Sequence, residues 1–245
     1  GAVTSRMTHS HPNMAQIPSS SSPYGEDCRA CWTVPEDYRL VGIDASGLEL
    51  RMLAHYLNDE GYTNEILNGD IHTANQNLAG LESRDQAKTF IYALLYGAGD
   101  AKLGSVVGRG RAHGKGLRQR FFDGLPSFKK LTDRVQGEAK SGFLKALDGR
   151  RLTVRSEHAA LNTLLQGAGA IVMKKALVIL DDMIRTNNWD AKFVANVHDE
   201  WQIECHLDDA VDVGKAGVEA IIQAGIELNL NCPLDGDYKV GENWS

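Results

Sequence analysis

Cysteine is scarce in this chain: its 245 residues include only four, too few for the disulfide framework of small secreted domains. Cys28 and Cys31 form one CxxC pair, but neither a second CxxC nor a His-x-x-x-His accompanies it, so a structural zinc site is not indicated. Long hydrophobic runs are also missing. We find no apolar run approaching the roughly 18 residues that cross a membrane, and no signal peptide at the start. We therefore expect free thiols, a reducing compartment and no membrane partner.

Positive charge is in deficit overall, because the formal net charge is −6. That value argues against a uniformly basic nucleic-acid binder. The average conceals a division, since residues 102–155 hold 14 Lys and Arg but only 4 Asp and Glu, whereas the remainder is acidic. A basic segment beside an acidic body suits a polyanion held next to a metal-binding carboxylate site. A pair of solvated charged helices would produce the same division.

Strand and helix patterns alternate along the chain. Period-2 alternation predicts strands at residues 38–44, 193–197 and 201–205, the last two forming a hairpin, and a short strand or hairpin at 149–156. Helical spacing of apolar residues predicts helices at 46–57, 83–96, 159–185 and 208–230, with further basic helical segments up to about residue 145. This order predicts an α+β fold, in which a helical subdomain is inserted into a sheet body.

Acidic side chains end two of the predicted strands. Asp44 closes the first strand, and Asp199 and Glu200 stand at the tip of the predicted hairpin. If these strands are neighbours in one sheet, the carboxylates meet at its edge. Such a site can hold two hard cations that activate a nucleophile and stabilise a leaving oxygen in phosphoryl transfer. Taken singly, these residues could also be a strand end and ordinary turn formers.

The helix at 83–96 carries a polar stripe. Arg84, Lys88, Tyr92 and Tyr96 follow one another at intervals of four and therefore share one helix face. Two cations followed by two phenols suit a triphosphate at one end and stacked bases at the other. The alternative is a helix that packs its tyrosines into a core while Arg and Lys face water.

The glycine-rich stretch "GSVVGRGRAHGKG", residues 104–116, invites a phosphate-loop interpretation that fails. Gly116 follows Lys115 where Ser or Thr is required, and no glycine stands five residues before Gly114. We therefore predict a flexible connection whose basic residues can contact a nucleic-acid backbone.

Three segments resemble, in order, the motifs of family A DNA polymerases, especially the replicative polymerases of short-tailed lytic phages. "DASGLELR" (44–51) is similar to motif A, "RDQAKTFIYALLYGAG" (84–99) to motif B and "VHDE" (197–200) to motif C. "GAVTSRMTHSHPNMAQIPS" resembles the segment leading into the palm, and "RSEHAALNTLLQGAGA" resembles the Q-helix region. The resemblance covers almost the whole chain.

The resemblance implies an antiparallel palm sheet backed by helices, with an inserted helical fingers subdomain. We expect palm at residues 1–60, fingers at 61–157 and palm again at 158–245. Nothing corresponds to the family's thumb or exonuclease domain, so we expect a fragment or one half of a split enzyme, served by a second polypeptide. Weak grip on the duplex and low processivity should follow. The phage likeness implies the host cytoplasm.

For the metal site, the resemblance implies that Asp44 and Asp199 bind two Mg²⁺ ions, for which Mn²⁺ can substitute. The backbone carbonyl of Ala45 would complete the protein's share of the ligands. Glu200 and His198 would support the primer terminus and the metal site. The implied partners are primer-template DNA and dNTPs, and the implied reaction is nucleotidyl transfer to a primer 3′-hydroxyl.

For the nucleotide, the resemblance implies that Arg84 and Lys88 grip the triphosphate, with help from His72, and that Lys88 also serves catalysis. Tyr92 would lie against the incoming sugar and Tyr96 near the templating base. Four residues match positions that touch the minor groove of the nascent duplex: Arg6, Gln16, His158 and Gln166.

Two other functions remain open. A single-subunit RNA polymerase shares the palm and the Lys and Tyr of motif B. Glu49 argues against it, because a glutamate under the sugar crowds a 2′-hydroxyl. The second alternative is a catalytically silent nucleic-acid-binding fragment that works only with a missing partner. Primer extension by the isolated chain, with dNTPs and with rNTPs, separates these functions.

Overall fold

The structure, a computed structural model, describes residues 2–245. Its contacts divide the chain into two compact units. Unit 1 consists of Gly1–Leu48 together with Ala168–Ser245, and unit 2 is Glu49–Gly167. Two helices belong partly to each unit, α2 (Leu48–Leu57) and α9 (Ala160–Asn187). The palm and fingers boundaries expected near residues 60 and 157 stay predictions.

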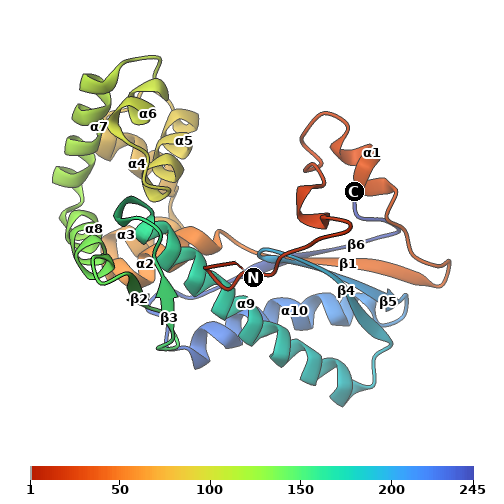
Figure 1. The fold of residues 1–245 in the computed structure, drawn as a ribbon. Coiled ribbons are helices and arrows are strands. Elements are labelled where there is room, and N and C mark those ends of the chain that lie inside the picture. The colour runs from red at the N-terminus through yellow and green to blue at the C-terminus, as the bar shows by residue number, and fades with distance from the viewer. Residues whose placement is uncertain (1) are drawn as a thin grey trace. The chain divides into compact units, whose positions relative to one another are not determined.

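Unit 1 is built on a four-stranded antiparallel sheet with the order β4-β5-β1-β6 (Figure 1). The predicted hairpin is present as β4 (Ala191–Val197) and β5 (Glu200–His206). The first predicted strand is β1 (Tyr38–Ala45), which pairs with β5 on one side. On its other side lies β6 (Gly236–Gly241), which the sequence did not predict because "GDYKVG" shows no clear apolar alternation.

One face of this sheet is buried by α10 (Ala210–Glu227), which packs on β1 and β6. Because side chains alternate along a strand, Val41 and Ile43 of β1 point to that face and are fully buried. A Cβ atom at Gly217 of α10 would lie 2.2 Å from Cδ1 of Ile43, so the missing side chain lets the helix lie directly on the sheet. Asp44 and its alternate neighbours therefore occupy the opposite face of the sheet.

Unit 2 is mainly helical and ends in a small hairpin (Figure 1). The predicted helix at 83–96 is present as α5. The short strand or hairpin predicted at 149–156 is present as a single strand, β3, whose partner β2 lies before the predicted range. Helices α3 and α4 were not predicted. The elements of unit 2 are α3 (Glu60–Asn68), α4 (Ile71–Ala79), α5 (Arg84–Leu95), α6 (Asp100–Ser105), α7 (Arg111–Gly124), α8 (Pro126–Ala139), β2 (Phe143–Lys145) and β3 (Arg151–Thr153).

Side-chain caps start three of these helices. Asp59 accepts a hydrogen bond from the backbone N–H of Tyr62 at the start of α3, and Asp70 and Ser83 cap α4 and α5 in the same way. Such caps satisfy backbone donors that have no partner inside the helix. The core of the unit contains an aromatic cluster, in which Phe90, Phe121 and Phe128 are buried and meet edge to face.

The glycine-rich stretch is not the flexible connection that we predicted. Its residues belong largely to α6 and α7, which pack closely against each other. A Cβ atom at Gly104 would lie 2.2 Å from the carbonyl oxygen of Gly110, and one at Gly114 would lie 1.8 Å from that of Asp100. The glycines serve close backbone approach between two helices, a role that composition cannot distinguish from flexibility.

Helix α9 corrects a second expectation. The helical segment Glu157–Asn187 is long and apolar enough to cross a membrane by length and composition alone, so the sequence does contain such a run. Its most apolar window is 67% buried inside the protein. A buried core helix of a protein passes the same test.

Candidate nucleotidyl-transfer site

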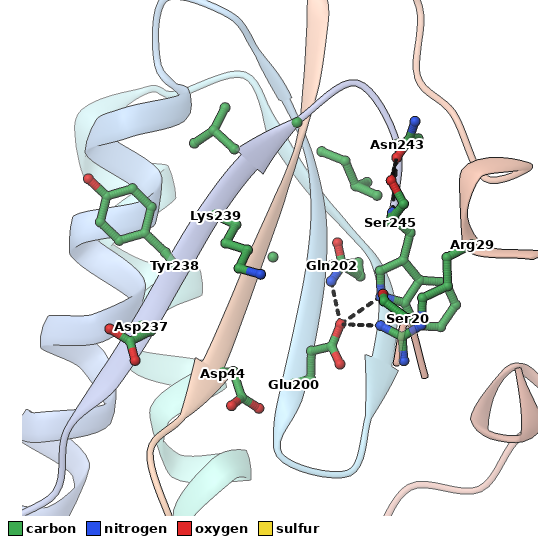
Figure 2. A pocket seen from close by; sticks show the side chains of 15 residues that line it. Ser20, Arg29, Asp44, Glu200, Gln202, Asp237, Tyr238, Lys239, Asn243 and Ser245 are labelled. Carbon is green, nitrogen blue, oxygen red and sulfur yellow. Dashed lines mark hydrogen bonds and ion pairs between the residues drawn. The ribbon is translucent and has the colours of Figure 1, made fainter. Parts of the chain in front are cut away.

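Strand register brings Asp44 and Asp199 together at one end of the unit 1 sheet. Asp44 is the Cα partner of Glu200 across β1 and β5, and the backbone N–H of Ala45 donates to the carbonyl oxygen of Asp199 at 3.0 Å. On the other side, Asp44 is the Cα partner of Asp237 in β6. We call Asp44, Asp199, Glu200 and Asp237 the carboxylate edge; Figure 2 shows Asp44, Glu200 and Asp237 beside one another.

The carboxylate edge is electrostatically crowded. Burial of the carboxyl group and the negative charges of Asp199, Glu200 and Asp237 together raise the pKa of Asp44 from 3.8 to about 6. Asp44 as a whole stays exposed, so water screens part of both effects. A cation at this edge would relieve the repulsion and restore the charged form.

The carboxylates of Asp44 and Asp199 fit a divalent cation that takes its remaining ligands from water and a bound substrate. Within residues 2–245, no group of three or more His, Cys, Asp or Glu side chains is arranged to hold a metal ion. Mg²⁺ does not need such a cage, because it is commonly bound by one or two carboxylates, water and substrate phosphates. The crowded carboxylates of Asp44 and Asp199 supply hard oxygen ligands of this kind. Divalent-metal dependence is general in the family reported below.

A cavity of about 410 Å³ opens on the same face of the sheet (Figure 2). Asp44, Glu200 and Asp237 line it, together with the cations Arg29 and Lys239. The sequence analysis assigned no role to Asp237, Arg29 or Lys239. Asp237 would have been found only if 236–241 had been recognised as a strand paired in register with β1.

The turn between β4 and β5 gathers three basic side chains. His198 takes a positive φ of 60° there. Burial and the charge of nearby Arg6 lower the pKa of His198, while Asp199 opposes them. His9, which the sequence analysis missed, has its Nε2 atom 2.6 Å from the carbonyl oxygen of Asn196. Arg6 and His198, both predicted DNA contacts, are thus brought together, and Gln16 lies in a short 3₁₀ helix that packs on β4.

In unit 2, the structure brings together the predicted triphosphate contacts. The Nε–H of Arg84 donates to Oδ2 of Asp70 at 2.7 Å, and this ion pair lowers the pKa of Asp70. Burial, then the positive charges of Arg84 and Lys88, lower the pKa of His72. The His72 ring lies 6.5 Å from that of Tyr92, centroid to centroid. We call Arg84, Lys88, His72 and Tyr92 the nucleotide face.

A second group of predicted residues surrounds the end of α5. The hydroxyl of Tyr96 donates to Oε2 of Glu49 at 3.5 Å, and the amide of Gln166 donates to the Tyr96 oxygen at 3.4 Å. Tyr96 is 49% exposed. The alternative in which the tyrosines pack into the core is therefore wrong for Tyr96, since α5 buries a different set: Ala87, Phe90, Ile91, Leu94 and Leu95.

Gly97 allows the chain to turn directly after α5 and to pass close to the backbone of His158. It adopts φ +75°, and a Cβ atom there would lie 2.0 Å from the carbonyl oxygen of His158. Both the backbone conformation and the close approach require glycine. The side chain of His158 is exposed nearby.

A family model described as DNA polymerase family A matches residues 1–245. The chain belongs to this family. It is 44% identical to the DNA-directed DNA polymerases of Enterobacteria phage T3 and Escherichia phage T7, over 100% of its own length. It is 32% identical to the DNA polymerase I of Aquifex aeolicus, again over its full length.

The chain spans only part of these relatives: 39% of the phage T3 enzyme, 40% of the phage T7 enzyme and 45% of the Aquifex enzyme. Among solved structures, the POL domain of Pol1 from M. smegmatis, in complex with DNA primer-template and dNTP, superposes with a TM-score of 0.90. The identity is 25%, over 99% of this chain and 46% of that one. The α+β fold class and the family A resemblance are both confirmed.

Proposed function

We propose that this chain is the polymerase region, palm and fingers, of a DNA-templated DNA polymerase that replicates a phage genome. The observation that carries the proposal is the meeting of Asp44 and Asp199 at one sheet edge, where burial and neighbouring like charges raise the pKa of Asp44. The relatives' shared description as DNA-directed DNA polymerases or DNA polymerase I supports the same reaction. The chain would add dNTPs to the 3′-hydroxyl of a primer.

In unit 1, the carboxylates of Asp44 and Asp199 and the backbone carbonyl of Ala45 would bind two Mg²⁺ ions, for which Mn²⁺ can substitute. When bound, such ions supply activation of the attacking hydroxyl and stabilisation of the leaving oxygen. His198 and Glu200 would orient the primer terminus beside the carboxylates. His198 is suited to this because it projects from a tight turn directly before Asp199.

In unit 2, Arg84 and Lys88 would bind the triphosphate, and Lys88 would stabilise the charge that develops on the leaving phosphate. His72 would donate a further hydrogen bond. The Arg84–Asp70 contact uses only the Nε–H of Arg84, so the terminal guanidinium nitrogens can still serve a phosphate.

The remaining roles in unit 2 concern the sugar, the bases and the product. Tyr92 would lie against the deoxyribose, and Glu49 would exclude a 2′-hydroxyl. Tyr96 would stand near the templating base, consistent with its exposure. Minor-groove contacts with the nascent duplex would come from Arg6, Gln16, His158 and Gln166. A second polypeptide carrying a thumb and an exonuclease would raise processivity, and the enzyme would act in the host cytoplasm.

Primer extension by the purified chain tests this function. We expect Mg²⁺-dependent extension with dNTPs and little with rNTPs. Asp44→Asn and Asp199→Asn should abolish extension, whereas Asp212→Asn, an exposed aspartate in the first turn of α10, should not. Wild-type chain that binds primer-template but never extends it would identify a silent nucleic-acid-binding fragment, and preferential use of rNTPs would identify an RNA polymerase.

A further inference from the structure

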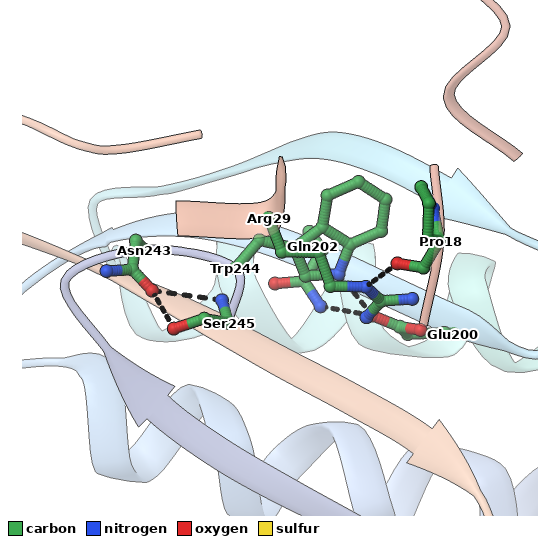
Figure 3. Close-up of polar contacts among 7 residues, drawn as sticks. All are labelled: Pro18, Arg29, Glu200, Gln202, Asn243, Trp244 and Ser245. Atoms are coloured by element: carbon green, nitrogen blue, oxygen red, sulfur yellow. Dashed lines mark hydrogen bonds and ion pairs between the residues drawn. The ribbon is translucent and has the colours of Figure 1, made fainter. Parts of the chain in front are cut away.

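The carboxylate of Glu200 is held by side chains that lie outside the three polymerase motifs. The indole N–H of Trp244 donates to Oε1 of Glu200 at 2.6 Å, and the amide of Gln202 donates to the same oxygen. A terminal nitrogen of Arg29 lies 3.9 Å from that oxygen. Figure 3 shows the three contacts converging. We call Arg29, Gln202 and Trp244 the Glu200 clamp.

The clamp is assembled from distant parts of unit 1. The Arg29 guanidinium lies over the Trp244 ring, 4.6 Å from its centroid, a cation–π arrangement. Its Nε–H donates to the carbonyl oxygen of Pro18 at 3.0 Å (Figure 3). The backbone N–H of Trp244 donates to the carbonyl oxygen of Trp32 at 3.2 Å. The segment that follows β6 is thereby joined to the segment that precedes β1.

Burial makes these contacts costly to lose. Trp244 is only 5% exposed and Gln202 only 6%. A buried donor that loses its acceptor pays a desolvation penalty, so the indole and the amide both favour the position of Glu200 that satisfies them.

Gly42 of β1 leaves room for the clamp. It is the Cα partner of Gln202, and a Cβ atom on Gly42 would lie 2.8 Å from the Gln202 side-chain nitrogen. The bare backbone at this position lets the Gln202 amide lie against the strand and reach Glu200. The cavity and the clamp thus share one glycine.

We infer that Arg29 and Trp244 are positioning residues, which hold the Glu200 carboxylate in place beside Asp44 and Asp199 for nucleotidyl transfer. The inference rests on the proposed function. A flexible glutamate next to two other carboxylates would be driven away by like-charge repulsion. Donors that converge on Oε1 oppose that repulsion, and a reacting group displaced by about 1 Å can lose on the order of 10²-fold in rate.

Trp244→Phe is the decisive variant, because it removes the indole N–H but keeps an aromatic ring beneath Arg29. We expect kcat for primer extension to fall about 10-fold while the dNTP KM changes less than about 2-fold. The matched control is Trp189→Phe, the same change beside a separate cavity near the end of α9, which should leave kcat unchanged. Arg29→Lys, which keeps the charge but loses the planar group, should give a smaller loss than Arg29→Ala.

A double-mutant cycle separates positioning from general structural support. If Trp244 acts through Glu200, Trp244→Phe should cause no further loss of kcat in a Glu200→Ala background, in which the indole N–H has lost its acceptor. If the kcat losses of the two single variants multiplied in the double variant, the inference would be overturned, although the proposed polymerase function would still hold.

The indole N–H signal of Trp244 in a ¹H–¹⁵N spectrum tests the contact without any activity. It should move in Glu200→Ala, which removes the acceptor, and the Trp189 signal should not. An unmoved Trp244 signal would overturn the clamp. If the wild-type chain extended no primer, the proposed function and the positioning role would both fail, while this signal would still decide whether the contact exists.

Discussion

The carboxylate edge of unit 1 and the nucleotide face of unit 2 gather like charge in opposite ways. At the edge, strand register places Asp44 between Glu200 and Asp237, and burial together with the repulsion of the neighbouring carboxylates raises the pKa of Asp44 to about 6. At the face, the charge of Arg84 is partly neutralised by Asp70, which lowers the pKa of Asp70.

The difference shows two ways to prepare a charged site before its ligand arrives. Unit 1 keeps the repulsion, so a cation that binds there relieves it. Unit 2 holds its cation in an exposed ion pair, which a triphosphate can share or replace at small cost. Neutralising the edge should therefore stabilise the fold, whereas removing a cation from the face should mainly weaken nucleotide use.

The largest effect should come from neutralising the edge. Asp199→Asn should lower extension by about 10³-fold or more, because it would remove one of the two carboxylates that we propose as metal ligands. The unfolding temperature should stay equal or rise, since one of the repelling charges is gone. Primer extension and thermal unfolding without metal measure the two effects. A clear fall in unfolding temperature would mean that Asp199 supports the fold and that the edge is not strained.

Lys88→Ala should have the next largest effect. We expect about 10²-fold loss in rate and weaker dNTP binding, because a cation beside the leaving phosphate stabilises the transition state. Primer-template affinity should stay near that of wild type. The control is Lys102→Ala, an exposed lysine of α6 in the same unit. If only DNA affinity fell, the face would be a backbone contact.

Tyr92→Phe should alter sugar choice by about 10- to 100-fold. The 3′-hydroxyl of a normal nucleotide helps to organise the triphosphate, and the Tyr92 hydroxyl could take its place when the sugar lacks one. Without that hydroxyl, a buried hydrogen bond worth roughly 1–3 kcal/mol is unmet. We expect normal dNTP use but strong discrimination against dideoxynucleotides. An unchanged terminator-to-dNTP ratio, with altered stability, would make Tyr92 a packing residue.

The smallest effect should come from His72. Burial and the charges of Arg84 and Lys88 lower the pKa of His72 below 6.5, so the residue is neutral in the free protein at neutral pH. A bound triphosphate should raise that pKa, so the dNTP KM should fall by about 2- to 5-fold between pH 7.5 and pH 6. His72→Gln should flatten this dependence. If the dNTP KM of the wild-type chain and of His72→Gln depended on pH in the same way, His72 would not contact the triphosphate.

Local patterns in the sequence were enough for the elements with strong periodicity. The strands at 38–44, 193–197 and 201–205 and the helices at 83–96, 159–185 and 208–230 are all present, with ends shifted by a few residues. Helices α3 and α4 escaped prediction because their polar faces dilute the periodicity, although their Asp59 and Asp70 caps were readable. The flexible connection predicted at residues 104–116 was wrong, because glycines that allow two helix backbones to approach leave no periodic signal in the sequence.

The sequence by itself determined the family, the α+β class and the residue types of the site, because the motifs that contain Asp44, Lys88 and Asp199 are local and long. Tertiary structure alone decided which other groups join them. Asp237 reaches Asp44 through the register of β6. Trp244 donates its indole N–H to Glu200 while its backbone N–H bonds to Trp32, far away in the sequence. Such contacts depend on strand pairing and on the packing of segments far apart in the sequence, and no spacing along the chain encodes either.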